Sequence, residues 1–103
     1  MRVFGLIGYP LSHSFSVKYF AEKFSKENIS NCVYQNFEIP SIDDFPLIIS
    51  DNPDLWGLNV TIPYKEKVIP FLTELSEVVR KTGACNCIKK TGKGLTGYNT
   101  DVS

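Results

Sequence analysis

Apolar residues fall into short runs along the chain, and turn-forming residues separate them. Residues 2–8 are almost continuously apolar without polar alternation, which predicts a strand buried on both faces. Residues 32–39 alternate between apolar and polar side chains, which is typical of a strand with one wetter face. Between these two runs, apolar residues recur at helical spacings of three and four, and this predicts a helix that presents Val17, Phe20, Ala21 and Phe24 on one face.

The second half of the chain continues this alternation. Residues 56–60 predict a buried strand that stops near Thr61, because Pro63 cannot donate to a sheet ladder. In chain order, the other expected elements are helices over 45–49, 64–72 and 73–82, a strand over 84–89, a turn over 91–94 and a return strand over 95–99. The last of these helices is expected to stop at Gly83. Together these elements predict an α/β fold, with one three-layer domain, a mostly parallel mixed sheet and helices on both faces.

Length and charge limit the classes of function. A chain of 103 residues is one domain by size, so we expect a single domain over 1–103. Eleven basic residues balance eleven acidic ones, so no basic field is available to attract nucleic acid or an anionic membrane. No apolar run approaches the roughly 20 residues that span a bilayer, and residues 2–8 are too short for a signal-peptide core. Three cysteines are an odd number, which argues against a disulfide framework and favours a reduced, cytoplasmic protein.

Polar side chains gather at the break after residues 56–60. An amide (Asn59), a hydroxyl (Thr61) and an amine (Lys65) lie within seven residues of one another. The carboxyl ends of strands are where α/β proteins bind ligands, so the group predicts a site for a small, oxygen-rich molecule. The alternative is a capped turn followed by one surface lysine.

A second candidate site follows residues 2–8. The loop carries Ser14 and Ser16 to the start of the predicted helix, where free backbone N–H groups and the helix dipole favour an anion. The alternative is that the two serines only cap the helix. His13, the single histidine, could act as an acid or base, but nothing in the sequence supplies an orienting partner, and a role in shaping the loop is favoured.

Two motifs do not indicate cofactor or metal sites. Residues 92–97 match the spacing G-x-G-x-x-G, but a dinucleotide fingerprint opens a helix, whereas a β-rich stretch follows here. These glycines therefore predict a hairpin turn. Cys85 and Cys87 are expected on one face of a strand, far in sequence from Cys32, so they do not form a tetrahedral metal set.

Four ordered motifs resemble those of shikimate dehydrogenase: Gly8-Tyr-Pro-Leu-Ser-His-Ser-Phe-Ser16, Asn59-Val-Thr-Ile-Pro-Tyr-Lys65, Gly83-Ala-Cys-Asn86 and Gly97-Tyr-Asn-Thr-Asp101. That family interconverts 3-dehydroshikimate and shikimate with NADP in aromatic amino-acid biosynthesis. Its N-terminal domain binds shikimate, and a C-terminal Rossmann domain binds NADP. The resemblance covers only the first domain. It therefore implies a truncated substrate-binding domain that is inactive alone, with no metal, from an enzyme that is a monomer or a homodimer.

The resemblance also implies a role for each matching residue. The substrate carboxylate would be bound by Ser14 and Ser16. Ring hydroxyls would be bound by Asn59, Thr61 and Asn86. The pair Lys65 and Asp101 would contact the reacting oxygen and handle its proton.

Some features leave alternatives open. Glu77 matches a position on the cofactor side of the family's cleft, or it is only a solvated helix residue. Cys87 departs from the threonine that the family usually carries after the asparagine. Two other functions are compatible with the sequence: a quinate/shikimate dehydrogenase, and a stand-alone binding module for a polyhydroxylated carboxylate.

Overall fold

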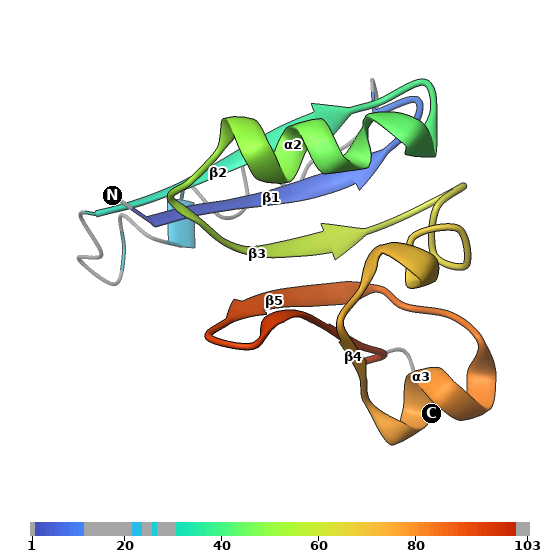
Figure 1. Cartoon of the computed structure of the whole chain (residues 1–103). Helices are drawn as coiled ribbons and strands as arrows, with labels where there is room; N and C mark the ends of the chain where they lie inside the picture. Colours follow the sequence, from blue (N-terminus) through green and yellow to red (C-terminus); the bar gives the residue numbers. More distant parts are fainter. Residues whose placement is uncertain (1, 12–21, 24–25, 27–30, 101–103) are drawn as a thin grey trace.

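Six strands form one mixed sheet in the computed structural model, which describes residues 2–11, 22–23, 26 and 31–100 (Figure 1). Their spatial order is β2-β1-β3-β5-β6-β4. The strands are β1 (Arg2–Gly8), β2 (Cys32–Glu38), β3 (Leu55–Val60), β4 (Glu74–Leu75), β5 (Cys87–Thr91) and β6 (Gly94–Tyr98). β1 pairs in parallel with β2 and β3, β4 pairs in parallel with β6, and β5 is antiparallel to β3 and β6. The predicted α/β class and mixed sheet are confirmed.

Among residues 31–100, two α-helices and two 3-10 helices accompany the sheet. They are η1 (Ile42–Asp44), α2 (Phe45–Asp51), η2 (Ile69–Phe71) and α3 (Glu77–Thr82). In Figure 1, α2 lies across β1 and β2. Phe45 of α2 and Val79 of α3 belong to the same buried cluster, so both helices cover the same core. The helix predicted to follow residue 16 lies outside the described residues for most of its length.

The side chains of β1 divide between two cores, one on each face of the sheet. Val3 and Ile7 join the main cluster with α2, and Ile7 is fully buried. Leu6 points to the other face, where it packs with Leu11 and Tyr34. Burial on both faces was the prediction for this apolar run, and it is confirmed because one buried cluster packs on each face of β1.

The prediction of a helix over residues 64–72 is wrong. In an α-helix the N–H of Ile69 would donate to the carbonyl of Lys65, but that carbonyl accepts from the N–H of Cys85 at 2.7 Å. The N–H of Ile69 instead bonds the carbonyl of Glu66 at 3.3 Å. The long-range bond to Cys85 therefore leaves a turn and the short η2, which contains Pro70.

The helix predicted over 73–82 begins later than expected. Glu74 and Leu75 pair with β6, and the N–H of Ser76 donates to the carbonyl of Gly97 at 2.9 Å, so this part of the chain is drawn into the sheet. Ser76 then caps α3, accepting from the N–H of Val79 at 3.3 Å. The end of the helix at Gly83, with φ of 73°, is as predicted.

The strand predicted over 84–89 is shifted, and the hairpin after it is confirmed. β5 begins at Cys87, so Cys85 lies before the strand and is fully buried in the main core. Cys87 instead lines a hollow that Tyr34 also borders, so the two cysteines do not share a face. Thr91 pairs with Gly94 across the turn, so the G-x-G-x-x-G motif is a hairpin.

We expect Phe45→Ala to lower the free energy of unfolding by about 3–5 kcal/mol, because Phe45 is only 1% exposed and its ring packs edge-on against Phe71 at 5.6 Å. Leu47→Ala is the matched control on the same helix, since Leu47 is 58% exposed, and it should change stability by less than about 0.5 kcal/mol. Urea unfolding followed by circular dichroism measures both values. Equal losses in the two variants would contradict this assignment of the core.

Candidate functional site

One edge of the sheet collects the carboxyl ends of β1, β3 and β6. β1 and β3 run in parallel, and β5 begins where β3 ends, with Cys87 opposite Asn59. β6 returns to the same edge, because Tyr98 pairs with Cys87. Segments that are far apart in the sequence therefore meet at the edge where α/β proteins bind ligands.

The turn after β3 sets the position of Lys65. The N–H of Thr61 donates to the carbonyl of Ile7 at 2.9 Å, and the N–H of Tyr64 donates to the carbonyl of Thr61 at 3.0 Å. Tyr64 is 2% exposed, and its hydroxyl donates to the carbonyl of Ile39, so it anchors the turn in the core. The bond from Cys85 to the Lys65 carbonyl then ties the backbone of Lys65 to the residue before Asn86. Lys65 itself is half-buried.

Asn86 is held from both sides by backbone hydrogen bonds. Its carbonyl accepts from the N–H of Val60 at 2.8 Å, and its own N–H donates to the carbonyl of Tyr98 at 3.0 Å. Its carboxamide makes two hydrogen bonds with Thr100. Nδ2 donates to Oγ1 of Thr100 at 2.9 Å, and Oδ1 accepts from the Thr100 N–H at 2.9 Å. The predicted residues Thr61, Lys65 and Asn86 therefore belong to one hydrogen-bonded frame.

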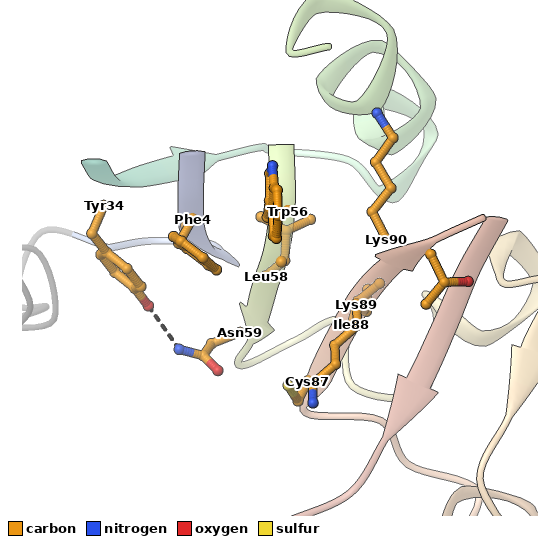
Figure 2. A pocket seen from close by; sticks show the side chains of 12 residues that line it. Phe4, Tyr34, Trp56, Leu58, Asn59, Cys87, Ile88, Lys89 and Lys90 are labelled. Atoms are coloured by element: carbon orange, nitrogen blue, oxygen red, sulfur yellow. Dashed lines mark hydrogen bonds between the residues drawn. The ribbon is translucent and has the colours of Figure 1, made fainter. Parts of the chain in front are cut away.

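Asn59 lies on the face of the sheet opposite α2, where its Nδ2 donates to the hydroxyl of Tyr34 at 2.9 Å (Figure 2). It borders a hollow of about 510 Å³ whose walls are mainly apolar, including Phe4, Trp56 and Cys87. Of the predicted site residues in the described ranges, Asn59 alone lines this hollow. The hollow is thus not built like a site for an oxygen-rich molecule.

Ser14, Ser16, His13 and Asp101 lie outside the described residues. The described residues continue to Leu11, three positions before Ser14. The N–H of Leu11 donates to a carboxylate oxygen of Glu38 at 2.5 Å. At the other end, Thr100 is the residue directly before Asp101.

Glu77 is the first residue of α3 and is exposed. Its carboxylate pairs with the Lys81 ammonium one turn later at 3.1 Å, and both side chains are solvated. This ion pair therefore lies within α3 itself.

Sequence reasoning missed Glu38 and Thr100. Glu38 ends a strand and carries no motif, so nothing in its neighbourhood signals the bond to Leu11. Thr100 lies inside the motif that ends at Asp101, and its place directly before a candidate residue was a usable signal.

The described residues include free thiols but no candidate metal cluster. Within them, no three or more His, Cys, Asp or Glu side chains come together to hold a metal ion. The helices that the structure describes are all too short or too polar to cross a bilayer. The three cysteines are free thiols. Burial raises the pKa of the Cys85 and Cys87 thiols above the ordinary value.

The fold and this edge define an α/β domain that gathers polar groups at the carboxyl ends of its strands. A family model, the shikimate dehydrogenase substrate binding domain, matches residues 6–88. The chain belongs to this family, as the four sequence motifs indicated.

Individual relatives agree with this membership. The chain is 46% identical over 102 residues to a shikimate dehydrogenase (NADP(+)) from Syntrophomonas wolfei, covering 97% of this chain and 34% of the relative. A crystal structure of shikimate dehydrogenase 1 from Peptoclostridium difficile is 39% identical, with a TM-score of 0.86 over 98% of this chain and 37% of that one. A shikimate 5-dehydrogenase from Thermus thermophilus, in complex with shikimate, is 26% identical with a TM-score of 0.87, covering 98% and 39%. The chain thus spans about a third of the length of these relatives.

We expect Lys89→Met to slow alkylation of Cys87 by iodoacetamide at fixed pH. The Lys89 charge lowers the pKa of this thiol against the effect of burial, so its removal raises the pKa and reduces the reactive thiolate. The measurement is the rate against pH in a Cys32→Ser background, since Cys85 is fully buried. Lys90→Met is the control and should leave the rate unchanged. A faster or equal rate in Lys89→Met would contradict the assigned charge effect.

Proposed function

We propose that residues 1–103 form the shikimate-binding, N-terminal domain of an NADP-dependent shikimate dehydrogenase. This enzyme would interconvert 3-dehydroshikimate and shikimate in the cytoplasm, in aromatic amino-acid biosynthesis, as a monomer or a homodimer. Family membership and the names of the relatives support the activity. The single observation that carries the proposal is the frame of backbone hydrogen bonds that joins Thr61, Lys65 and Asn86 at one edge of the sheet.

In the proposed site, different residues bind the carboxylate and the ring hydroxyls of the substrate. Ser14 and Ser16 bind the carboxylate, as expected for the helix start that the sequence predicts there, because backbone N–H groups and the helix dipole favour an anion. Asn59, Thr61 and Asn86 bind ring hydroxyls. Each carboxamide has two donors and two acceptor lone pairs, so the bonds of Asn59 to Tyr34 and of Asn86 to Thr100 leave further groups for a ligand.

The proposed chemistry centres on Lys65 and Asp101. When the substrate carbonyl becomes an alcohol, negative charge develops on its oxygen, and an ammonium beside it stabilises that charge and can supply the proton. The carboxylate of Asp101 orients Lys65 and binds the same substrate oxygen. In the opposite direction, the pair accepts the hydroxyl proton.

The described residues do not form a cradle for a dinucleotide. The glycine-rich motif at residues 92–97 consists of a hairpin turn and most of strand β6, and it does not open a helix. In our proposal NADP is therefore held mainly by the part of the enzyme beyond this chain. Glu77, exposed at the start of α3, is the residue of this chain that we propose to face the cofactor side.

The direct test is an assay of the full-length protein that contains this chain. Shikimate-dependent reduction of NADP⁺ is expected, with quinate as the competing substrate. Activity with quinate at least equal to that with shikimate would favour a quinate/shikimate dehydrogenase. Shikimate binding without any turnover would favour a binding module.

The isolated domain should fold by itself, with a cooperative thermal transition, because the described residues supply a six-stranded sheet with its own buried core. It should bind shikimate more weakly than the full-length enzyme and should not reduce NADP⁺, since the cofactor-binding part is missing. Calorimetry and an absorbance assay measure these two properties. NADP⁺ reduction by the isolated domain would contradict the proposal that the cofactor is bound mainly outside residues 1–103.

Three variants of the full-length enzyme should separate binding from catalysis. Lys65→Ala should lower kcat by about 10²–10⁴-fold with KM nearly unchanged, because it removes a group that acts mainly in the transition state. Ser14→Ala should raise KM and leave kcat mostly intact, since the carboxylate is bound similarly in the ground and transition states. Asp101→Asn should fall between the two. Wild-type kcat with a raised KM in Lys65→Ala would make Lys65 a binding residue.

A further inference from the structure

Thr100 and Asn86 form a two-bond ring at the edge of the sheet. The Thr100 N–H donates to Oδ1 of Asn86 at 2.9 Å, and Nδ2 of Asn86 donates to Oγ1 of Thr100 at 2.9 Å. The backbone of Asn86 is separately fixed to Val60 and Tyr98. The ring with Thr100 therefore sets the rotation of the carboxamide itself, which the backbone bonds do not control.

The chemistry of the two partners permits one orientation of the carboxamide. A flipped carboxamide would turn its NH₂ group toward the Thr100 N–H, so that two donors would face each other. In the observed orientation Oδ1 keeps one lone pair and Nδ2 keeps one N–H beyond the ring. A substrate hydroxyl is both a donor and an acceptor, so this spare pair matches one hydroxyl or two neighbouring ones.

The Thr100 hydroxyl is the part of this ring that a substitution can remove. The terminal χ2 torsion of asparagine is broad, so one remaining bond from the Thr100 N–H would fix the carboxamide loosely. Loss of Oγ1 would also leave Nδ2 with both N–H groups unassigned. The side chain of Thr100 is exposed, so its removal leaves the core intact.

We propose that Thr100 is a positioning residue for substrate binding. Its hydroxyl holds the Asn86 carboxamide in the orientation that offers one donor and one acceptor to the substrate hydroxyls. This inference rests on the proposed function, in which Asn86 binds the ring of shikimate.

The test compares Thr100→Val and Thr100→Ser in the full-length enzyme. Valine has nearly the shape of threonine but cannot accept from Nδ2, whereas serine can. We expect Thr100→Val to raise the KM for shikimate about 3- to 10-fold with kcat within about twofold, the loss typical of one neutral hydrogen bond. Thr100→Ser should restore KM to within about twofold of the wild type. Thr91→Val, on the exposed hairpin, controls for the exchange itself and should leave KM unchanged.

A double-mutant cycle shows whether Thr100 acts through Asn86. In an Asn86→Ala background, Thr100→Val should add no further increase in KM. Equal increases in Thr100→Val and Thr100→Ser, or an undiminished effect in the Asn86→Ala background, would overturn the proposal. If Thr100→Val does not fold, Thr100→Ala takes its place with the same expected increase.

Different results would overturn the proposed function and the role of Thr100. A wild-type full-length enzyme without shikimate turnover or binding would overturn the proposed function and this inference with it. An active wild type whose KM is insensitive to Thr100→Val would overturn the role of Thr100 alone.

Discussion

The backbone of Asn86 is the connection on which the candidate site depends. One of its hydrogen bonds reaches Val60 at the end of β3, and the other reaches Tyr98 at the end of β6. These two bonds join the parallel half of the sheet to the hairpin just before β5 begins. They extend the pairing of β5 with β3 and β6 by one residue, and so place Asn86 next to the residue before Thr61 and close to Thr100.

The close approach of β1 to the turn after β3 is a second constraint. A Cβ atom on Gly8 would lie 2.5 Å from Cγ2 of Thr61, closer than real Cβ contacts allow. Glycine at this position therefore permits the bond between Thr61 and Ile7 that ends the strand pair. In the same way, Gly97 permits β6 to pack against Leu72 and Cys85, since a Cβ there would lie 2.6 Å and 3.0 Å from their side chains. Both glycines lie at the edge that carries the candidate site.

The two faces of the sheet differ in how they are filled. The face toward α2 and α3 is a continuous core that includes Ile7, Phe45 and Val79. The opposite face carries the smaller cluster around Leu6 and the apolar hollow beside Asn59. Asn59 therefore donates to the hydroxyl of Tyr34 from a position near the carboxyl end of β3. We assign it a structural role through this bond, in addition to the proposed role in substrate binding.

The sequence by itself determined the elements whose signals are local. The apolar run of β1, the proline after β3, the glycine that ends α3 and the hairpin between β5 and β6 were all predictable, because each depends on side-chain pattern or backbone freedom at one place. The sequence also indicated the family through four ordered motifs. Tertiary structure alone decided the turn at Lys65 and the delayed start of α3, because hydrogen bonds from Cys85 and β6 compete with helix formation there. It also decided the pairing of Asn86 with Thr100, since residues 14 positions apart meet only after β5 and β6 have formed a hairpin.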